Sequence, residues 1–196
     1  GAGSTLWIRD MEDPKGEFVQ IAFDMDYNYS PIDIIDGKMY IMTNYGAPRG
    51  MVCVVNVEDV NKASIENWEV LIPESENVMV GAQMGAGKLI VTYDKDAANH
   101  AYVYNLDGTL KHEIQFPTFG STGIVSRYEE SEIFYAFTSF TFPTTIYKYD
   151  IESNTSEVFR APKVDFNPED YTTEQIFFTS KDGTRVPMFL TYKKDL

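Results

Sequence analysis

The stretch Ser131–Asp150, SEIFYAFTSFTFPTTIYKYD, is the clearest indication of how this chain folds. Aromatic and β-branched residues alternate with smaller or more polar ones over Ile133–Phe140, and the alternation resumes over Thr145–Asp150. Pro143 marks the break between the two runs. Two such runs around a short connection that contains proline are typical of a β-hairpin, so two antiparallel strands are predicted here.

Similar strand-like segments fill the chain up to residue 160. A partial unit is expected over residues 5–23, and units of four strands over residues 28–73, 76–117 and 121–160. The second strands of the complete units centre near Ile41, Ile90 and Tyr135, which are 49 and 45 residues apart (90 − 41 and 135 − 90). Four-stranded units that recur about every 40–50 residues are the sequence signature of β-propeller blades. We therefore predict an all-β fold, a partial propeller of about three four-stranded blades plus part of another.

Turn residues support this division. Asp36-Gly37, Gly85-Ala86-Gly87 and Asp107-Gly108 fall between expected strands, where a positive φ is often required. An irregular β-sandwich with similar strand lengths is the alternative fold. At most one or two helical turns are expected, over Val60–Glu66.

The number of blades predicts that the chain is part of a larger protein. Natural propellers have about four to eight blades, so three blades and a fragment do not close a ring. Left alone, the chain would expose strand edges and aromatic faces that favour pairing with another copy. A homodimer through open sheet edges is therefore expected.

Composition excludes several classes of function. The formal charge of −14, from 30 acidic and 16 basic residues, argues against a nucleic-acid partner, because phosphate binding needs clustered Lys and Arg. No apolar run approaches the roughly 20 residues of a membrane helix, so we expect a soluble protein without a membrane partner. Hydrophobic residues at 43%, with 14% aromatics, favour a folded, aromatic-rich β-protein.

The sequence changes character after Arg160. Residues 161–170, APKVDFNPED, contain two prolines and no alternation, which is typical of an extended linker. A further hairpin is predicted over Tyr171–Ser180 and Thr184–Lys193, around Lys181-Asp182-Gly183. Because its sequence breaks the blade pattern, residues 161–196 are interpreted as a linker and the opening of a second domain.

Two groups of motifs occur near this boundary. The first comprises Phe137-Thr138-Ser139-Phe140, Pro143, Ile146-Tyr147, Tyr149-Asp150 and Val158-Phe159-Arg160; the second comprises Asp170-Tyr171, Ser180-Lys181-Asp182-Gly183-Thr184 and Val186-Pro187-Met188-Phe189. Together they resemble the last propeller blade and the start of the α/β-hydrolase domain of prolyl oligopeptidases. Leu6-Trp7 and Trp68–Pro73 fit the same family more weakly. The oligopeptidase B branch shares part of these motifs, so a fragment of such a peptidase is an alternative.

The resemblance implies a cytoplasmic or periplasmic serine endopeptidase that cleaves short, proline-containing oligopeptides after proline. In that family a propeller caps the hydrolase domain and excludes large, folded substrates. The Ser-His-Asp triad lies in the hydrolase domain. No triad residue is carried over to this chain, which is expected to be inactive alone and to gate substrate access. Arg9 matches a position on a strand that borders the substrate pocket, with an ordinary surface arginine as the alternative.

The residues themselves provide no catalytic centre. The chain contains no Gly-x-Ser-x-Gly nucleophile elbow, and Gly120-Ser121-Thr122-Gly123 has the wrong spacing. His100, in the polar turn KDAANH, and His112, among charged residues of a strand, are the two histidines and are both interpreted as solvent-facing.

Metal, cofactor and modification sites are not expected either. Asp24, Asp26 and Asn28 have the spacing of the first ligands of a calcium loop, but the sixth and twelfth positions do not fit. Cys53 is the single cysteine and is interpreted as a small core residue, which excludes an internal disulfide and a Cys-based zinc site. Asn154-Thr155-Ser156 is a formal glycosylation sequon that is explained by turn chemistry.

Two hypotheses of function follow. The first is a fragment of a prolyl oligopeptidase, with the last part of its propeller and the first hairpin of its peptidase domain. The second is a non-catalytic propeller module that binds a peptide or protein. The hairpin predicted after residue 170 favours the first, because a free-standing propeller has no need for it.

Overall fold

The computed structural model describes residues 3–59 and 65–195, and over these residues the chain is built from strands. The first pair is β1 (Leu6–Ile8) and β2 (Val19–Ala22). The first sheet contains β3 (Tyr29–Ile35), β4 (Lys38–Thr43), β5 (Met51–Asn56) and β6 (Glu69–Ile72). The second sheet contains β7 (Val78–Gly85), β8 (Lys88–Lys95), β9 (Ala98–Tyr104) and β10 (Leu110–Ile114). The third sheet contains β11 (Ser121–Val125), β12 (Ile133–Thr138), β13 (Thr145–Asp150) and β14 (Thr155–Arg160).

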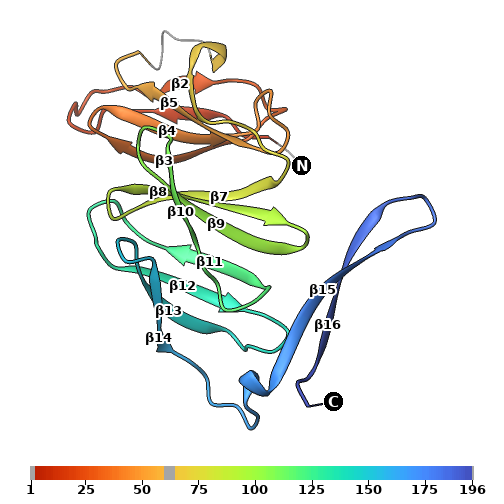
Figure 1. The fold of residues 1–196 in the computed structure, drawn as a ribbon. Helices are drawn as coiled ribbons and strands as arrows, with labels where there is room; N and C mark the ends of the chain where they lie inside the picture. Colours follow the sequence, from red (N-terminus) through yellow and green to blue (C-terminus); the bar gives the residue numbers. More distant parts are fainter. Residues whose placement is uncertain (1–2, 60–64, 196) are drawn as a thin grey trace.

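Each of the three sheets is a meander in which every strand pairs antiparallel with the next one along the chain. The sheets stack face to face in chain order, with the third sheet at the end next to the last hairpin (Figure 1). Consecutive four-stranded antiparallel sheets of this kind are propeller blades, so the predicted all-β, partial-propeller fold is confirmed. The hairpin predicted within residues 131–150 is β12–β13, in which Tyr135 lies opposite Tyr147.

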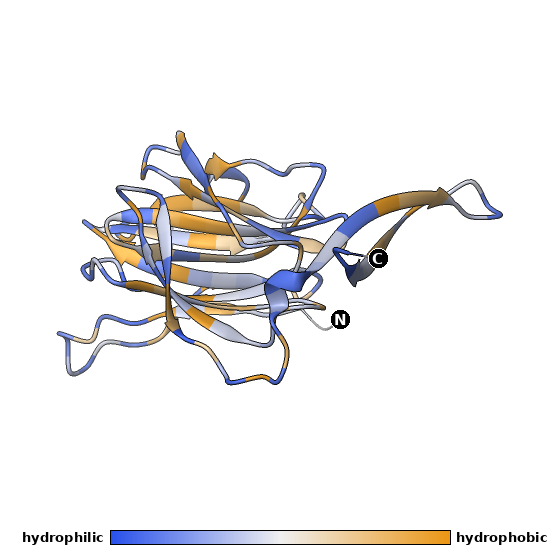
Figure 2. Ribbon diagram, turned by 60° about the horizontal axis from the view of Figure 1, so that its bottom comes forward, coloured by the Kyte–Doolittle hydropathy of each residue, from blue (hydrophilic) through white to orange (hydrophobic). Residues whose placement is uncertain are grey.

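Buried side chains form one layer between each pair of neighbouring sheets. The middle strands contribute alternate residues to the two layers: on β5, Cys53 and Val55 face the β1–β2 pair, whereas Val52 and Val54 face the second sheet. On β8, Leu89 and Val91 face the first sheet and Ile90 faces the third. A strand that is covered on both faces must be apolar throughout, which explains the uninterrupted runs MVCVV and LIV. Figure 2 shows these hydrophobic stretches within the stack.

The third sheet is covered on one face. Its inner residues include Ile133, Tyr135 and Phe137, each at most 1% exposed. On β14 every residue is exposed, including Val158 at 59% and Phe159 at 57%. The uncovered face carries Phe134 and Phe159 beside charged residues such as Lys148, and with the free edge strand β14 it presents a surface that another element can cover.

The expected turn residues occupy the turns. Asp36 and Gly37, between β3 and β4, have φ of 48° and 73°, the left-handed region that the tight hairpin turn requires. The β8–β9 turn uses Asp96 and Ala97 in the same region, with φ of 50° and 62°.

Two expected elements differ in the structure. The strand predicted to reach Phe140 ends at Thr138, because the Ser139 side chain accepts hydrogen bonds from the backbone N–H groups of Thr141 (3.3 Å) and Phe142 (3.0 Å) and turns the chain. Of the helical turns predicted over Val60–Glu66, residues 60–64 lie outside the described residues. Ile65–Asn67 forms a single 3₁₀ turn.

The last element is a separate hairpin of β15 (Tyr171–Thr179) and β16 (Arg185–Lys193), which pair over nine positions. A short 3₁₀ turn, Pro168–Asp170, precedes it, with the Asn167 side chain capping its start. The hairpin leaves the stack at an angle and projects away from the sheets (Figures 1 and 2). Among the described residues, no helix is long and apolar enough to cross a membrane.

Candidate functional site

Arg9 lies directly after β1, on the partial unit. Its guanidinium is 5.7 Å from the centre of the Phe18 ring, and its Nη2 donates a long hydrogen bond of 3.5 Å to the carbonyl of Pro14. Its Nε is buried and has no hydrogen-bond partner. The side chain is therefore half-buried and held on one side, and its assignment to a substrate pocket stays a prediction.

The sequence suggested that His100 lies in a turn, but the structure places it in a strand. The β8–β9 turn closes early, at Asp96 and Ala97, so β9 begins at Ala98 and includes His100. The His100 Nδ1 lies 2.7 Å from a Glu113 carboxylate oxygen on the neighbouring strand β10. This histidine is half-buried and is part of a strand-to-strand contact.

The interpretation of His112 as solvent-facing is also wrong. Its Nε2 lies 2.7 Å from the Tyr149 hydroxyl, which in turn donates to the Asn154 side-chain oxygen at 2.9 Å. The Asn154 amide donates to the carbonyl of Glu113 at 3.2 Å. Burial lowers the pKa of His112, and the nearby Lys111 ammonium lowers it further. The group is a bridge between the second and third sheets.

Asn154 of the sequon is the residue that turns the chain between β13 and β14. Its φ of 54° is in the left-handed region, which asparagine tolerates better than most residues. Its amide is already committed to the bridge between the sheets, consistent with a structural role.

The residues of the calcium-like spacing make local contacts, and the Asp24 carboxylate supports a turn. An Asp24 carboxylate oxygen accepts from the backbone N–H of Asp26 at 2.9 Å, and the backbone N–H of Asn28 donates to the Asn44 side chain at 2.7 Å. Over residues 3–59 and 65–195, no group of three or more His, Cys, Asp or Glu side chains is placed to hold a metal ion.

Two further sequence candidates have structural positions. Cys53 is 1% exposed in the middle of β5, where burial raises the pKa of its thiol to about 11 and disfavours the reactive thiolate. Ser121 begins β11 and pairs with Thr138 in an ordinary antiparallel ladder, so it is not on a strand-to-helix elbow.

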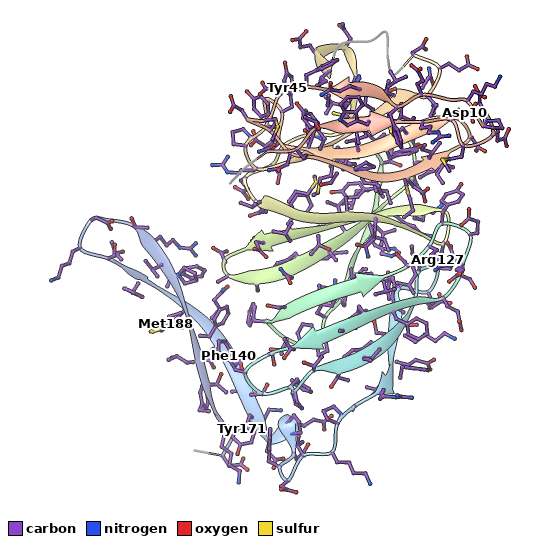
Figure 3. The ribbon with its side chains drawn as sticks, turned by 180° about the vertical axis from the view of Figure 1, so that it is seen from behind. Asp10, Tyr45, Arg127, Phe140, Tyr171 and Met188 are labelled. Carbon is purple, nitrogen blue, oxygen red and sulfur yellow. The ribbon has the colours of Figure 1, made fainter. Side chains whose placement is uncertain are left out.

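The feature that sequence reasoning missed is the joint between the stacked sheets and the β15–β16 hairpin. Phe189 on β16 lies between Phe119, in the β10–β11 connection, and Phe140, in the β12–β13 connection, with ring centres 5.6 Å apart in both pairs. A cavity of about 250 Å³ beside these rings is lined mainly by apolar groups. Figure 3 shows Phe140 on the side of the third sheet that faces the hairpin.

Polar contacts extend the same joint to the second sheet. The Gln175 side chain on β15 donates to the backbone carbonyl of Asp96 at 2.6 Å. Arg185 on β16 lies 3.6 Å from the Asp96 carboxylate, and its guanidinium stacks over Phe177 at 3.2 Å from the ring centre. The motifs that contain Phe140 and Phe189 are visible in the sequence, but their contact across 49 residues (189 − 140) is not.

Comparison with known proteins places these features in a family. The model of the prolyl oligopeptidase N-terminal β-propeller domain matches residues 1–162. The prolyl endopeptidase of Elizabethkingia meningoseptica is 34% identical over 195 residues, which is 99% of this chain and 27% of that protein. The prolyl endopeptidase of Dictyostelium discoideum is 28% identical over 88% of the chain and 24% of its own length.

Solved structures agree with the fold. One, from a study of two prolyl endopeptidases, superimposes with a TM-score of 0.79 at 31% identity, over 93% of this chain and 27% of its own. The apo form of prolyl oligopeptidase B from Galerina marginata gives a TM-score of 0.84 at 22% identity, over 97% of this chain and 28% of its own. The chain thus spans about a quarter of the length of the proteins that it matches.

Proposed function

The chain belongs to the prolyl oligopeptidase family, with residues 1–162 in its N-terminal β-propeller domain, and from this premise we propose that it is part of a serine endopeptidase that cleaves short peptides after proline. The observation that carries the proposal is the extent of the match. The propeller model ends at residue 162, whereas the similarity to the Elizabethkingia prolyl endopeptidase covers 99% of the chain and so includes the β15–β16 hairpin.

We propose that the hairpin is the first element of the peptidase domain. One face of it turns toward the sheets through Gln175, which contacts Asp96, and Phe189, which contacts Phe140. The other face carries Met188 and Leu190, which are 39% and 40% exposed. An antiparallel pair with apolar residues on its free face needs a further layer to cover them, which the rest of a hydrolase domain would provide.

The part played by the propeller is proposed to be control of access. Among the described residues, both imidazoles are engaged within the stack, His100 with Glu113 on the neighbouring strand and His112 with Tyr149 of the third sheet, so neither histidine is free to act as a general base. A rigid stack of sheets can limit entry to flexible peptides without touching the reaction.

Arg9 is proposed to border the substrate pocket in the complete protein. Its support is geometric: the guanidinium is held against Phe18, and its buried Nε has no partner among the described residues. In the protein that contains this chain, Arg9→Ala is expected to raise KM for a proline peptide with little change in kcat, and Arg9→Lys to restore part of the loss. An unchanged KM in both variants would remove Arg9 from the site.

We also propose that the chain, taken alone, pairs with a second copy through the free edge strand β14, which is exposed throughout. Light scattering is expected to give the mass of a dimer, and a strict monomer at high concentration would contradict this. A cytoplasmic or periplasmic location of the parent protein is proposed from the family and is tested by cell fractionation.

The activity itself is tested with a chromogenic proline-containing peptide. The chain alone is expected to show no hydrolysis above buffer, because its described residues hold no triad. The parent protein, whose reading frame beyond Leu196 should encode a Gly-x-Ser-x-Gly elbow, is expected to cleave the peptide and to be blocked by a serine-directed inhibitor. Turnover by the chain alone, or a stop codon soon after residue 196, would overturn the proposal in favour of a binding module.

A further inference from the structure

Two cavities adjoin each other where the β10–β11 connection leads from the second sheet to the third. The first, of about 250 Å³, is lined by Phe119, Phe140 and Phe189 together with small residues of the connections. The second, of about 230 Å³, is lined by residues of β9 and β10 and also by Phe119. Because Phe119 lines both cavities, they form one recess with two compartments.

The first compartment is aromatic. Its three rings come from three separate segments, the β10–β11 connection, the β12–β13 connection and β16. The ring centre of Phe189 lies 5.6 Å from those of Phe119 and Phe140. Phe140 is 71% exposed, so aromatic surface can be reached from solvent. The face of an aromatic ring attracts a cation as well as apolar groups, and arginine is the cation found there most often.

The second compartment contributes a carboxylate. Glu113 lines it, is 36% exposed, and contacts the His100 Nδ1 at 2.7 Å and the Tyr102 hydroxyl. An ionised carboxylate has about four acceptor positions, so these two contacts leave room for a further donor. Among the described residues, no Lys or Arg lines either compartment. The recess therefore combines aromatic rings with a carboxylate, and these residues supply no permanent cation to it.

An arginine side chain matches both compartments. Its stem is apolar, and its planar cation stacks on aromatic rings and forms paired hydrogen bonds with carboxylates. The hairpin beside the recess already shows this chemistry, since Arg185 stacks over Phe177 at 3.2 Å from the ring centre and lies 3.6 Å from the Asp96 carboxylate. The net charge of −14 also favours the approach of a cationic ligand. The aromatic compartment is smaller than the roughly 300–1,000 Å³ of sites for drug-sized ligands, so it suits a single side chain.

We propose that this recess binds an arginine side chain of a peptide, which packs against Phe119, Phe140 and Phe189 and directs its guanidinium to Glu113. The rings provide the stacking surface, and the carboxylate provides the selection for positive charge. The proposal does not rest on the proposed function. If that function is correct, the recess adds a preference for peptides that carry a basic residue.

The recess is tested by titrating the ¹⁵N-labelled 196-residue chain with two short peptides. One is acetyl-Gly-Arg-Gly-amide, and the other has citrulline in place of arginine, which keeps the length of the side chain but carries no charge. The arginine peptide is expected to shift the amide signals of Phe119, Phe140, Phe189 and Glu113. It should bind about fivefold more tightly than the citrulline peptide, because both the rings and the carboxylate favour a cation.

Substitutions separate the contributions of the ring and of the charge. Phe140→Ala and Phe140→Leu both remove an aromatic face, and each should weaken binding of the arginine peptide by about threefold or more. Glu113→Gln keeps an acceptor for His100 and removes the charge, so it should reduce the preference for arginine over citrulline. Met188→Ala, one residue from Phe189 but on the opposite face of β16, is the matched control and should change neither affinity. Unchanged thermal midpoints verify that the variants are folded.

Equal affinities for the arginine and citrulline peptides, or no saturable shift with either peptide, would overturn the proposal. An affinity that survives in both Phe140 variants, or that falls equally in Met188→Ala, would do the same. The titration needs no peptidase activity. Its failure would therefore leave the proposed function standing, and a failed peptidase assay would leave the arginine site standing.

Discussion

His112 on β10 and Tyr149 on β13 form a hydrogen bond of 2.7 Å that joins the second sheet to the third. The Tyr149 hydroxyl donates its proton to Asn154, so it accepts from the His112 Nε2–H. The Lys111 ammonium, 2.8 Å from the Glu152 carboxylate, makes a second link between the same sheets. The second and third sheets are therefore held by polar contacts from β10 to β13 and to the β13–β14 turn, as well as by the apolar layer between them.

The His112 bridge predicts a pH dependence of stability. Burial keeps the pKa of His112 in the folded chain below its usual value. Between the folded and unfolded pKa values the unfolded chain binds more protons, so this contribution is complete above about pH 6.5 and is lost as the pH falls through that window. His112→Gln lacks the titrating group. The thermal midpoint of the wild type should therefore fall relative to that of His112→Gln as the pH is lowered from neutral to mildly acidic.

The comparison between variants is needed because the chain carries a net charge of −14, and protonation of its carboxylates also changes stability in this range. His100→Gln removes the other imidazole and keeps the His112 bridge, so the pH-dependent difference should survive in it. A difference between wild type and His112→Gln that stays constant with pH would contradict the assignment.

Asn154 has two separable roles, and two substitutions distinguish them. Asn154→Gly keeps the left-handed turn but loses the hydrogen bonds to Tyr149 and Glu113, so it should cost about 1 kcal/mol or slightly more. Asn154→Ala loses the hydrogen bonds and also places a β-carbon at a φ of 54°, which should add roughly 1 kcal/mol. Urea unfolding measures both values. An equal loss of unfolding free energy in the two variants would contradict the expected cost of a β-carbon at this left-handed position.

Much of the fold could be predicted because its signals are local. The runs MVCVV and LIV, the turn residues Asp36-Gly37 and the alternation within Thr145–Asp150 all report on strands a few residues long. Repetition of these signals at a nearly constant spacing then indicates stacked units. The end of β12 at Thr138 was missed because a single side chain, Ser139, competes with the strand for backbone hydrogen bonds.

The contacts of the candidate site could not be predicted, since they depend on which distant residues meet. His112 and Tyr149 are 37 residues apart in sequence, and His100 and Glu113 are 13 apart. Polar residues in strands at such separations look like surface residues until the register is known. The contacts of Phe189 with Phe119 and Phe140 depend on the β10–β11 and β12–β13 connections. The shapes of these connections are set by turns and not by any periodic pattern.

The third sheet should respond differently to substitutions on its two faces. Phe137 is fully buried and stacks on Phe116 with ring centres 5.6 Å apart, so Phe137→Ala should cost about 3–5 kcal/mol. Phe134, on the other face of β12, is half-buried and contacts the exposed Phe159, so Phe134→Ala should cost roughly 1 kcal/mol. Urea unfolding measures the loss of unfolding free energy in each variant, provided that both variants unfold with the m-value of the wild type. Similar costs would mean that the outer face is covered in solution, for example by a second copy.

Gly120 and Gly123 provide a matched pair for the connection that leads into the third sheet. A β-carbon on Gly120 would lie 2.3 Å from the Thr138 carbonyl oxygen and 2.6 Å from the Phe137 ring, so Gly120→Ala must displace backbone or a buried ring. Overpacking of this kind typically costs about 1–3 kcal/mol. A β-carbon on Gly123, three residues along, meets no atom within 4 Å. Gly123→Ala should be neutral, or stabilise by roughly 0.4–1 kcal/mol by restricting the unfolded chain.

The two glycine variants should also differ in their effect on the β15–β16 hairpin. The Gly120 carbonyl accepts from the backbone N–H of Asn99 at 2.9 Å. The preceding residue, Phe119, contacts the Phe189 ring on β16. Displacement of this connection in Gly120→Ala should therefore alter the ¹H–¹⁵N signals of β16 as well as those of the third sheet, whereas Gly123→Ala should alter only signals near β11. If Gly120→Ala lowers the unfolding midpoint no more than Gly123→Ala does, then the close approach of the β10–β11 connection to Thr138 is not maintained in solution.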